Sequence, residues 1–404
     1  MITFEEAKRR ILESVATVKE TKRITVISSL NRILSSDVIA PFDVPPHNNS
    51  AMDGYAVRYE DISETDEVRL KVIGDLPAGG YFDKEIGSGE AVRIMTGAEM
   101  PKGADTVVIQ EVTRQEGNWV NLPPKAAKKG ANVRFQGEDI GKGKLILQKG
   151  IWIRPQEMGI LASIGYTTIS VYRPLNIAIV STGDELVPTG EKLTPGKIYD
   201  SNRHSLMGLL TQIGAEVIDL GIVKDDRDAL KTKLVAATHK ADVIITSGGV
   251  SVGKYDLVKE VVEELGKVEF WQVNIKPGKP LSYGKIGNCY FFGLPGNPVS
   301  AMVTFIKFIK PALLKIAGCK NYDKTIQFKA KAKSSMTKKR GRLEFARGIL
   351  SYEKDSWVVT LTGPQGSGIL HSMTLANCLV IMLPDQKEIV EGDEVLVEPL
   401  EWVI

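Results

Sequence analysis

NIAIVSTGDEL, residues 176–186, is the stretch that decides the fold class. Its first half is an apolar run typical of a buried strand, and the run ends at hydroxyl, glycine and carboxylate residues. A helical pattern follows, for which Ser201 or Asn202 is the expected capping residue. Strand and helix patterns then continue to alternate, so we expect an open, mostly parallel α/β sheet over residues 171–318.

The regions on either side of this sheet differ from it in pattern. Residues 42–136 are rich in glycine and short β-like runs, which predicts a β-rich insert domain. Residues 319–404 carry further short strand patterns and favour a small β-barrel or a sandwich. Residues 1–41 begin with an amphipathic helix, and we expect them to join residues 137–170 in one discontinuous mixed domain. The expected fold class is therefore multidomain, α/β plus β.

Composition excludes several classes of protein. The chain has 404 residues, of which 43% are hydrophobic and 25% charged, as in ordinary globular proteins. Its net charge of +3 gives no strong field for nucleic acid or a membrane surface. The three cysteines lie far apart in sequence without a CxxC pair, which argues against a disulfide framework or a zinc ribbon. With no apolar leader or spanning segment visible, we expect a cytoplasmic protein with neither membrane nor nucleic acid as a partner.

Three loops at predicted strand ends carry the candidate chemistry. They are TGDEL at 182–186, SGGVSVG at 247–253 and LPGNP at 294–298, the last of which opens a helix. In open parallel sheets ligands bind at the carboxyl ends of strands, and the amides of a helix N-terminus favour phosphate. Any one loop alone is more often a simple turn or helix start. Together the three favour a site for a phosphate-bearing ligand.

Acidic residues in the same region suggest a cation. Asp184 and Glu185 follow one strand, Asp225 and Asp226 follow another, and Asp256 precedes a helix. Carboxylates that converge beside phosphates usually bind Mg²⁺. Helix capping is the alternative role for each of these aspartates.

The segment Lys276-Pro-Gly-Lys-Pro280 adds two ammonium groups. They are suited to capture an oxyanion, although a solvated turn is an equally good interpretation. The chain has no GxGxxG after the first strand of the α/β region and no GxxxxGK[ST] loop. A dinucleotide-dependent dehydrogenase and a P-loop NTPase are therefore disfavoured.

Ordered sequence blocks across most of the chain resemble one family, the molybdopterin molybdenumtransferases (MoeA and the E domain of gephyrin). The blocks are PPHNNSAMDGYA (45–56), RIMTGAEMPKGAD (93–105), GEDI (137–140), STGDEL (181–186), TSGGVSVGKYD (246–256), IKPGKP (275–280), GLPGNPVS (293–300), RLEFARG (342–348) and GPQGSG (363–368). Single-domain adenylyltransferases of the same pathway share only the α/β part.

This resemblance implies an elongated homodimer of four-domain subunits. It also implies a reaction in which molybdate is inserted into adenylylated molybdopterin with release of AMP and with Mg²⁺ assisting cleavage of the pyrophosphate. The cleft is expected to be shared between subunits, because the β insert of one subunit completes the α/β site of the other. A molybdopterin adenylyltransferase is the expected pathway partner.

The candidate residues follow from these motifs. The resemblance gives catalytic roles to Asp53, Thr96, Asp139 and Glu185. Magnesium ligands are expected at Glu185, Asp225 or Asp226, and Asp256. Candidate ligand-binding positions are Thr182, Gly183, Ser247, Gly248, Gly249, Ser251, Lys276, Lys279, Pro295, Gly296, Asn297, Pro298, Arg347 and Ser367.

Among these positions, Ser251, Lys276, Lys279, Arg347 and Ser367 are expected to hold the tetrahedral oxyanion.

Two alternative functions stay open at this point. One is a paralogue that inserts tungstate, an anion of the same charge and nearly equal size. The other is a non-catalytic protein that binds the pterin or serves as a scaffold.

Overall fold

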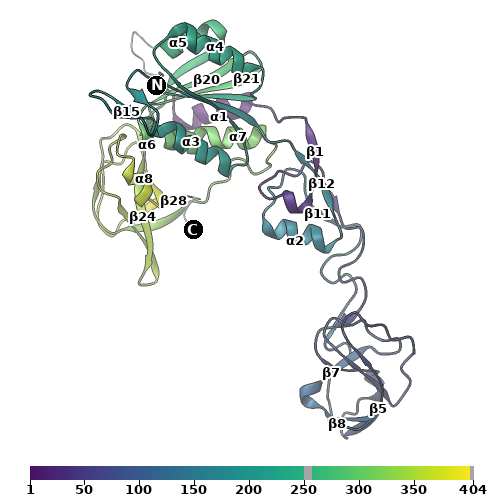
Figure 1. The fold of residues 1–404 in the computed structure, drawn as a ribbon. Helices are drawn as coiled ribbons and strands as arrows, with labels where there is room; N and C mark the ends of the chain where they lie inside the picture. The colour runs from purple at the N-terminus through teal and green to yellow at the C-terminus, as the bar shows by residue number, and fades with distance from the viewer. Residues whose placement is uncertain (250–256, 401–404) are drawn as a thin grey trace.

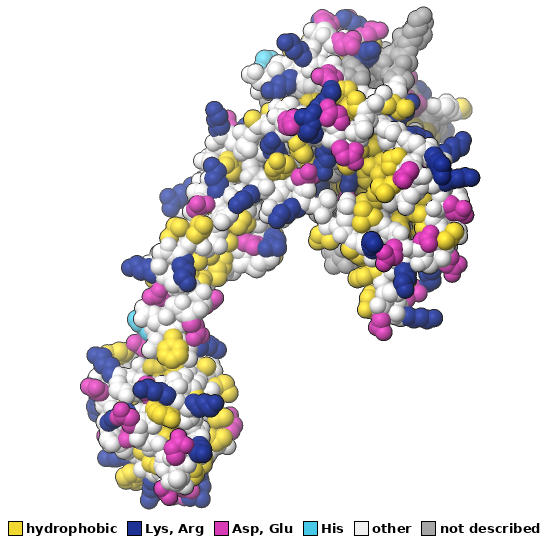
Figure 2. All heavy atoms as spheres, turned by 180° about the vertical axis from the view of Figure 1, so that it is seen from behind, with side chains coloured by type: hydrophobic (Ala, Val, Ile, Leu, Met, Phe, Trp, Pro, Cys, Tyr) yellow, Lys and Arg dark blue, Asp and Glu magenta, His cyan; other side chains and the backbone are white. Residues whose placement is uncertain are grey.

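The computed structural model describes residues 1–249 and 257–400, and its shape is elongated (Figure 1). The α/β domain and a C-terminal barrel lie at one end, and a β-rich domain lies at the other. A narrow middle part connects the two ends. Basic and acidic side chains are interspersed over the face drawn in Figure 2. No helix in the described part of the chain is long and apolar enough to cross a membrane.

The α/β domain is built on a six-stranded sheet in the order β16-β13-β17-β21-β20-β18. The first four strands run parallel, whereas β20 and β18 are antiparallel to their neighbours, so the mostly parallel sheet is confirmed. The strands are β13 (Asn176–Thr182), β16 (Glu216–Val223), β17 (Val243–Ser247), β18 (Gly266–Gln272), β20 (Pro280–Ile286) and β21 (Cys289–Leu294).

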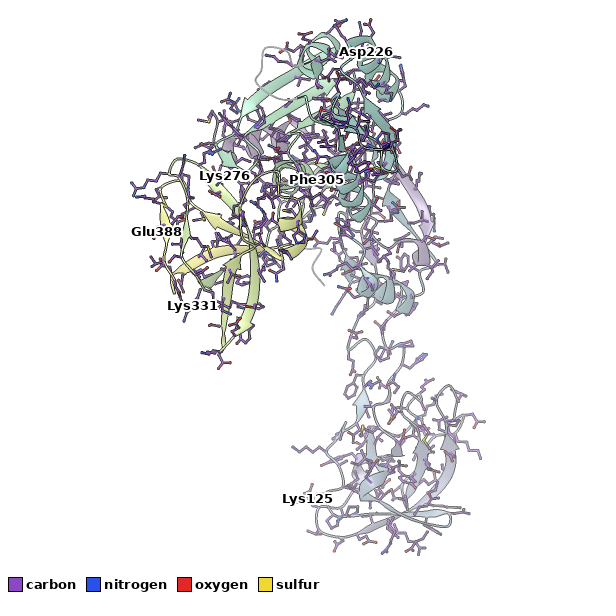
Figure 3. The ribbon with its side chains drawn as sticks, turned by 60° about the vertical axis from the view of Figure 1, so that its left-hand side comes forward. Lys125, Asp226, Lys276, Phe305, Lys331 and Glu388 are labelled. Carbon is purple, nitrogen blue, oxygen red and sulfur yellow. The ribbon has the colours of Figure 1, made fainter. Side chains whose placement is uncertain are left out.

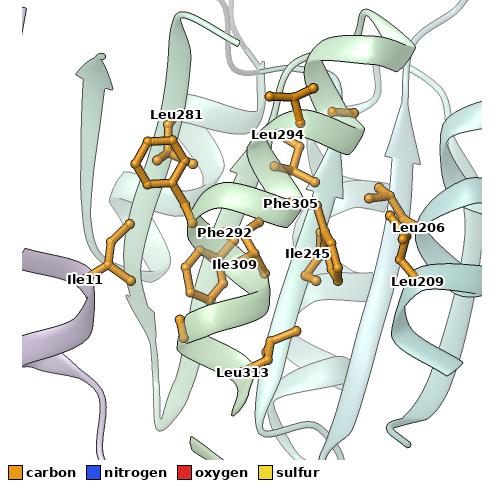
Figure 4. Close-up of a cluster of buried hydrophobic side chains, with 14 of the residues drawn as sticks. Ile11, Leu206, Leu209, Ile245, Leu281, Phe292, Leu294, Phe305, Ile309 and Leu313 are labelled. Atoms are coloured by element: carbon orange, nitrogen blue, oxygen red, sulfur yellow. The ribbon is translucent and has the colours of Figure 1, made fainter. Parts of the chain in front are cut away.

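Helices cover both faces of this sheet. One face packs on α4 (Arg227–Thr238) and α5 (Leu257–Leu265). The other packs on α3 (Ser201–Gln212), α6 (Pro298–Thr304) and α7 (Lys310–Ile316), the last two joined by a π-helical turn at Phe305–Ile309. Figure 4 shows Phe292, Phe305 and Ile309 packed in that second core.

Two expectations for this region were wrong. The N-cap of α3 is Asp200, whose side chain accepts a hydrogen bond from the backbone N–H of Arg203, and neither Ser201 nor Asn202 caps the helix. The amphipathic helix α1 (Phe4–Ser14) was assigned to the discontinuous domain. Its buried Ala7 and Ile11 instead pack in the α/β core, so residues 1–41 are divided between two cores.

The middle part combines segments from both sides of the insert. Strand β1 (Thr21–Thr25) pairs with β12 (Thr168–Tyr172), and β2 (Val38–Ile39) pairs with β11 (Leu145–Leu147). The helix α2 (Pro155–Ser163) packs with these strands in one hydrophobic cluster.

The insert is a six-stranded sheet in the order β7-β4-β6-β5-β9-β8, with an apolar cluster on either side. Its strands are β4 (Gly54–Val57), β5 (Val68–Leu76), β6 (Glu90–Ile94), β7 (Thr106–Ile109), β8 (Arg114–Glu116) and β9 (Trp119–Leu122). The short pair β3 (Asn49–Ser50) and β10 (Val133–Arg134) leads into and out of it.

The C-terminal region is a closed barrel, which decides between the two architectures expected there. The strands run β24-β25-β22-β28-β26, and β26 pairs again with β24. Their bounds are β22 (Phe328–Ala332), β24 (Leu343–Glu353), β25 (Ser356–Leu361), β26 (Cys378–Met382) and β28 (Glu394–Pro399). Strand β19 (Ile275–Lys276) of the α/β domain pairs with the start of β24, and this pairing joins the two domains.

Candidate active site

The carboxyl ends of β13, β17 and β21 open into a cleft of about 770 Å³. Its walls come from the α/β domain and from the barrel, which contributes Arg342, Gln365, Gly366 and Ser367. Figure 3 shows Lys276 at the boundary between the two domains. Twelve of the candidate residues line this cleft: Thr182, Gly183, Glu185, Asp225, Gly248, Gly249, Lys276, Lys279, Pro295, Gly296, Asn297 and Ser367.

The other candidates lie elsewhere. Ser247, Pro298 and Arg347 are absent from the wall of the cleft. Asp53, Thr96 and Asp139 belong to the insert and the segment that returns from it, away from the α/β domain (Figure 1). Ser251 and Asp256 fall outside the described residues.

Glu185 and Asp225 supply the acidic side of the cleft. The carboxylate of Glu185 folds back over Gly183, where a Cβ atom would lie 2.4 Å from Oε2 of Glu185. The loop that carries Asp225 is tied to the same strand end, because its backbone N–H donates to Oδ1 of Asp184 over 3.1 Å. Asp184 thus holds two loops together, and the two carboxylates beside it remain exposed to the cleft.

Asp226 has a different role from its neighbour. It is the N-cap of α4, and its Oδ1 accepts a hydrogen bond of 2.9 Å from the backbone N–H of Ala229. A side chain engaged in this way satisfies one of the unpaired N–H groups of the first helical turn. Asp226 does not line the cleft.

Lys276 and Lys279 supply the basic side. Nζ of Lys276 donates to Oε1 of Glu344 over 2.8 Å, and the glutamate side chain is only 6% exposed against 39% for the lysine. The loop between the lysines is tight, because Gly278 has φ = +99° and a Cβ there would lie 2.4 Å from Oγ1 of Thr304. Only glycine fits this position without strain.

Arg347 and Ser367 shape the barrel side of the cleft. Arg347 is 1% exposed, with Nε donating to Oγ of Ser372 and Nη2 donating to the carbonyl of Gly366. Burial lowers the pKa of Arg347. The side chain of Gln365 forms two hydrogen bonds with the backbone of Arg347. Oε1 of Gln365 accepts from the N–H of Arg347 at 2.8 Å, and Nε2 of Gln365 donates to the carbonyl of Arg347 at 3.2 Å. The carbonyl of Ser367 accepts from the N–H of Val299, so this loop is also fastened to the first turn of α6.

Asp53 and Thr96 form a pair at the edge of the insert. Oδ1 of Asp53 accepts from the backbone N–H of Thr96 at 2.7 Å and from its hydroxyl at 2.8 Å. These two hydrogen bonds lower the pKa of the carboxyl, with the backbone bond as the larger cause. Asp53 is therefore a partly exposed, ionised group held in a fixed orientation.

Comparison with known proteins identifies the family. Family models match for the MoeA N-terminal region (domain I and II) over residues 2–165, a probable molybdopterin binding domain over 178–315, and the MoeA C-terminal region (domain IV) over 329–400. A molybdopterin molybdenumtransferase of Haemophilus influenzae is 40% identical over 100% of both chains. The chain belongs to the MoeA family of molybdopterin molybdenumtransferases.

Other MoeA proteins agree with this assignment. A molybdopterin molybdenumtransferase of Nostoc sp. is 37% identical, over 94% of this chain and 88% of its own. The crystal structure of a molybdopterin biosynthesis moeA protein from Pyrococcus horikoshii superposes with a TM-score of 0.85 at 30% identity, covering 99% of this chain and 100% of that one. The expected family, the multidomain fold class and the class of enzyme, a transferase of molybdenum cofactor biosynthesis, are thereby confirmed.

Sequence reasoning missed several residues of this MoeA cleft. Arg342 and Gln365 line it from the barrel and Ile198 from the short strand β15 (Ile198–Tyr199), yet none was selected. Asn202 was expected as a helix cap, whereas its Nδ2 donates to Oγ of Ser247 and to the carbonyl of Gly296, fastening two strand-end loops together. Arg342 and Gln365 lie within the blocks RLEFARG and GPQGSG, so the motifs held a signal for both.

Proposed function

We propose that this MoeA-family transferase inserts molybdate into adenylylated molybdopterin and releases AMP, with Mg²⁺ assisting cleavage of the pyrophosphate. The observation that supports this most directly is that acidic and basic side chains line the same cleft. Glu185, Asp225, Lys276 and Lys279 all line it. Such a site could hold a cation near the phosphates of the substrate and could also hold an anion, as the proposed reaction requires.

The donor set of the acidic side fits magnesium. No cluster of three or more His, Cys, Asp or Glu side chains that could hold a metal occurs within residues 1–249 and 257–400. Mg²⁺ needs no such cluster, because it is commonly bound by one or two carboxylates together with substrate phosphates and water. Glu185 and Asp225 are the two that would hold it here. When bound, the ion would offset negative charge that develops on the pyrophosphate oxygens.

The basic side fits a tetrahedral oxyanion. Lys276, Lys279 and the hydroxyl of Ser367 all border the cleft and can donate hydrogen bonds to molybdate, the metal-bearing substrate. Arg347 was expected to bind the oxyanion as well. The hydrogen bonds that its guanidinium donates to Ser372 and Gly366 support a contribution through the loop that presents Ser367.

Asp53, Thr96 and Asp139 act, in this proposal, from the second subunit of a homodimer. They belong to the part of the chain remote from the cleft of their own subunit (Figure 1). Their role requires a symmetric dimer in which each insert reaches the partner's cleft, an arrangement that closed two-fold symmetry allows. A molybdopterin adenylyltransferase would supply the adenylylated substrate.

The magnesium role is tested with three variants of the full-length protein. Glu185→Gln and Asp225→Asn should each be almost inactive in AMP release at the Mg²⁺ concentration that saturates the wild type, and a large excess of Mg²⁺ should restore part of the activity. Asp226→Ser is the matched control, because serine also caps helices, and its Mg²⁺ dependence should equal that of the wild type. An unchanged Mg²⁺ requirement in Glu185→Gln and Asp225→Asn would refute the assignment.

The identity of the oxyanion is tested by supplying molybdate and tungstate in parallel and measuring metal bound to the released pterin. Faster insertion of molybdate supports the proposal. Faster insertion of tungstate contradicts the choice of metal. Uptake of adenylylated pterin without AMP release contradicts the catalytic role and supports a pterin-binding protein.

A further inference from the structure

The insert is connected to the middle part by two passes of the chain, residues 41–48 on the way out and residues 135–142 on the way back (Figure 1). We call these two segments the neck. In the part of the chain that the structure describes, only Val44 and Ile140 of the neck pack in a hydrophobic core. Phe42 and Phe135 are 40% and 52% exposed. Because the neck has so few apolar contacts, hydrogen bonds must supply most of what holds it in place.

The backbones of the two passes are joined over a short length. The N–H of Val44 donates to the carbonyl of Ile140 over 2.7 Å, and the N–H groups of Asp139 and Ile140 donate to the carbonyl of Val44 over 3.1 Å. The N–H of Gly137 donates to the carbonyl of Pro45 over 3.0 Å. Each of these bonds involves Val44 or Pro45, so backbone pairing joins the two passes of the neck near one point.

The side chain of Asp43 adds two further hydrogen bonds between the passes. Oδ1 accepts from the backbone N–H of Lys142 over 2.7 Å, and Oδ2 accepts from Nε2 of Gln136 over 2.8 Å. These bonds lower the pKa of the carboxyl, with the bond from Lys142 as the larger cause. The returning pass also lies close to the carboxylate, because a Cβ atom at Gly137 would lie 3.1 Å from Oδ1 of Asp43. Asp43 is therefore ionised at neutral pH, and hydrogen bonds to an ionised acceptor are stronger than those between neutral groups.

The segment that Asp43 holds carries a candidate catalytic residue. Asp139 lies between Gln136 and Lys142 in the sequence, so the carboxylate of Asp43 binds the chain on both sides of it. Asp139 itself is exposed. The neck also determines the direction in which the insert, with Asp53 at its edge, extends from the middle part (Figure 1). A carboxylate that fixes the neck thus fixes the position of both aspartates.

We propose that Asp43 is a positioning residue of the transferase, whose carboxylate clamps the neck and sets Asp139 and the insert in the orientation that the partner's cleft requires. This inference rests on the proposed function, in which the insert of one subunit completes the cleft of the other. Asp43 acts through other residues and does not touch the substrate. Its loss should slow AMP release without weakening the binding of molybdate, because small errors in the placement of reacting groups cost rate.

The test compares three variants of the full-length protein by the kcat of AMP release and by calorimetric titration with sodium molybdate. Asp43→Ala removes both acceptors and should lower kcat about tenfold or more, with molybdate affinity within twofold of the wild type. Asp43→Asn should recover most of kcat, because its amide oxygen can still accept from Lys142 and the amide of Gln136 can rotate to accept from the new amide. Asp37→Ala is the matched control. Oδ1 of Asp37 accepts from the backbone N–H of Lys149 over 2.7 Å, a bond of the same kind between the same two passes but within the middle part. Its kcat should equal that of the wild type.

Hybrid dimers separate a defect of the insert from a general loss of structure. In a hybrid of Asp43→Ala with Glu185→Gln, one cleft has an intact Glu185 and receives an insert with an intact neck, so about half of wild-type AMP release is expected. In a hybrid of Asp43→Ala with Asp53→Asn, each cleft receives an impaired insert. That hybrid should be no faster than the Asp43→Ala homodimer.

The outcomes separate this inference from the proposed function. Wild-type kcat in Asp43→Ala, or an equal loss of kcat in Asp37→Ala, overturns the inference and leaves the proposed function standing. An Asp43→Asn variant as slow as Asp43→Ala also contradicts the clamp, because the hydrogen bonds would then not account for the effect. Wild-type protein that releases no AMP rejects the proposed function, and the positioning role of Asp43 with it. Urea unfolding curves of Asp43→Ala and Asp37→Ala should coincide, since each variant loses the same kind of exposed contact.

Discussion

The ammonium group of Lys276 lies 2.8 Å from the carboxylate of Glu344, and the same two residues are paired through the backbone of β19 and β24. A lysine of the α/β domain is thus positioned by the barrel. Because Glu344 is nearly buried and Lys276 is partly exposed to the cleft, the barrel controls both the location of this cation and its effective charge.

Glu344→Gln should strengthen binding of molybdate by roughly tenfold, about 1.4 kcal/mol. Glutamine keeps an oxygen that can accept the hydrogen bond from Lys276, but it removes a negative charge that repels an incoming dianion. Calorimetric titration with molybdate measures the effect. Equal or weaker binding would mean that Glu344 does not limit the affinity by its charge.

The control for this variant is a second lysine–glutamate pair between the same domains. Nζ of Lys307 lies 2.6 Å from Glu398, and neither residue lines the cleft. Glu398→Gln should leave molybdate affinity unchanged. A change in affinity there would indicate that both substitutions act through the packing of the two domains.

The pair of Lys307 and Glu398 carries a prediction about stability. Both side chains are about 5% exposed or less, and the ammonium lies 5.0 Å from the ring centroid of Phe345. Burial lowers the pKa of Lys307, and Glu398 opposes this by favouring the charged form. Glu398→Gln should cost about 3–5 kcal/mol, because it leaves a buried ammonium without its counter-charge.

The double variant Lys307→Met with Glu398→Leu separates charge from packing. Removal of both charged groups should restore most of the lost stability, since apolar residues of similar volume can replace a buried ion pair. Urea unfolding followed by circular dichroism measures both variants. A double variant as unstable as the single one would contradict the ion-pair explanation.

Gly278→Ala tests how tightly the lysine loop must be held. The positive φ and the 2.4 Å approach of a Cβ to Thr304 leave no room for a methyl group, so the loop must shift. Molybdate affinity should fall about tenfold, in line with the loss of a charge-assisted contact. Gly287→Ala is the control: Gly287 also has a positive φ, +56°, but the nearest atom to its Cβ is 3.9 Å away and it lies outside the cleft. It should cost about 1–2 kcal/mol of stability without changing affinity.

The sequence predicted the strands, helices and loops of the site better than it predicted which other parts of the chain they pack against. The strand at 176–182 and the acidic loop after it were recognisable because apolar runs and turn residues are local signals. The face of α1 was also recognisable as apolar, but nothing in its sequence says which core covers it. The N-cap of α3 was expected at Ser201 or Asn202, one or two residues too late, because Asp200, Ser201 and Asn202 are all good capping residues.

Charged residues of the barrel were the hardest to predict. Arg347 is fully buried, which is rare for arginine and depends on contacts with Ser372 and Gly366 that are distant in sequence. Arg342 immediately precedes β24, and no local pattern distinguishes it from the exposed Arg340. Its place in the cleft follows from the pairing of β19 with β24, a contact between two domains that periodicity does not reveal.

Mixing of inactive subunits tests the shared cleft proposed for the dimer. Asp53→Asn inactivates the insert and Glu185→Gln inactivates the α/β cleft, so each homodimer should be inactive. In the hybrid dimer one cleft receives an intact Asp53 from one subunit and an intact Glu185 from the other. When equal amounts of the two variants pair at random, half of the dimers are hybrids, and one of the two clefts in each hybrid is intact. The mixture should therefore show about one quarter of wild-type AMP release. Co-expression with two affinity tags isolates the hybrid, which should show about one half of wild-type AMP release.

The control is a hybrid of Glu185→Gln with Asp225→Asn, two residues of the same cleft. It should stay inactive because every cleft then carries one substitution. An inactive hybrid of Asp53→Asn with Glu185→Gln would show that the insert does not complete the cleft of a partner subunit.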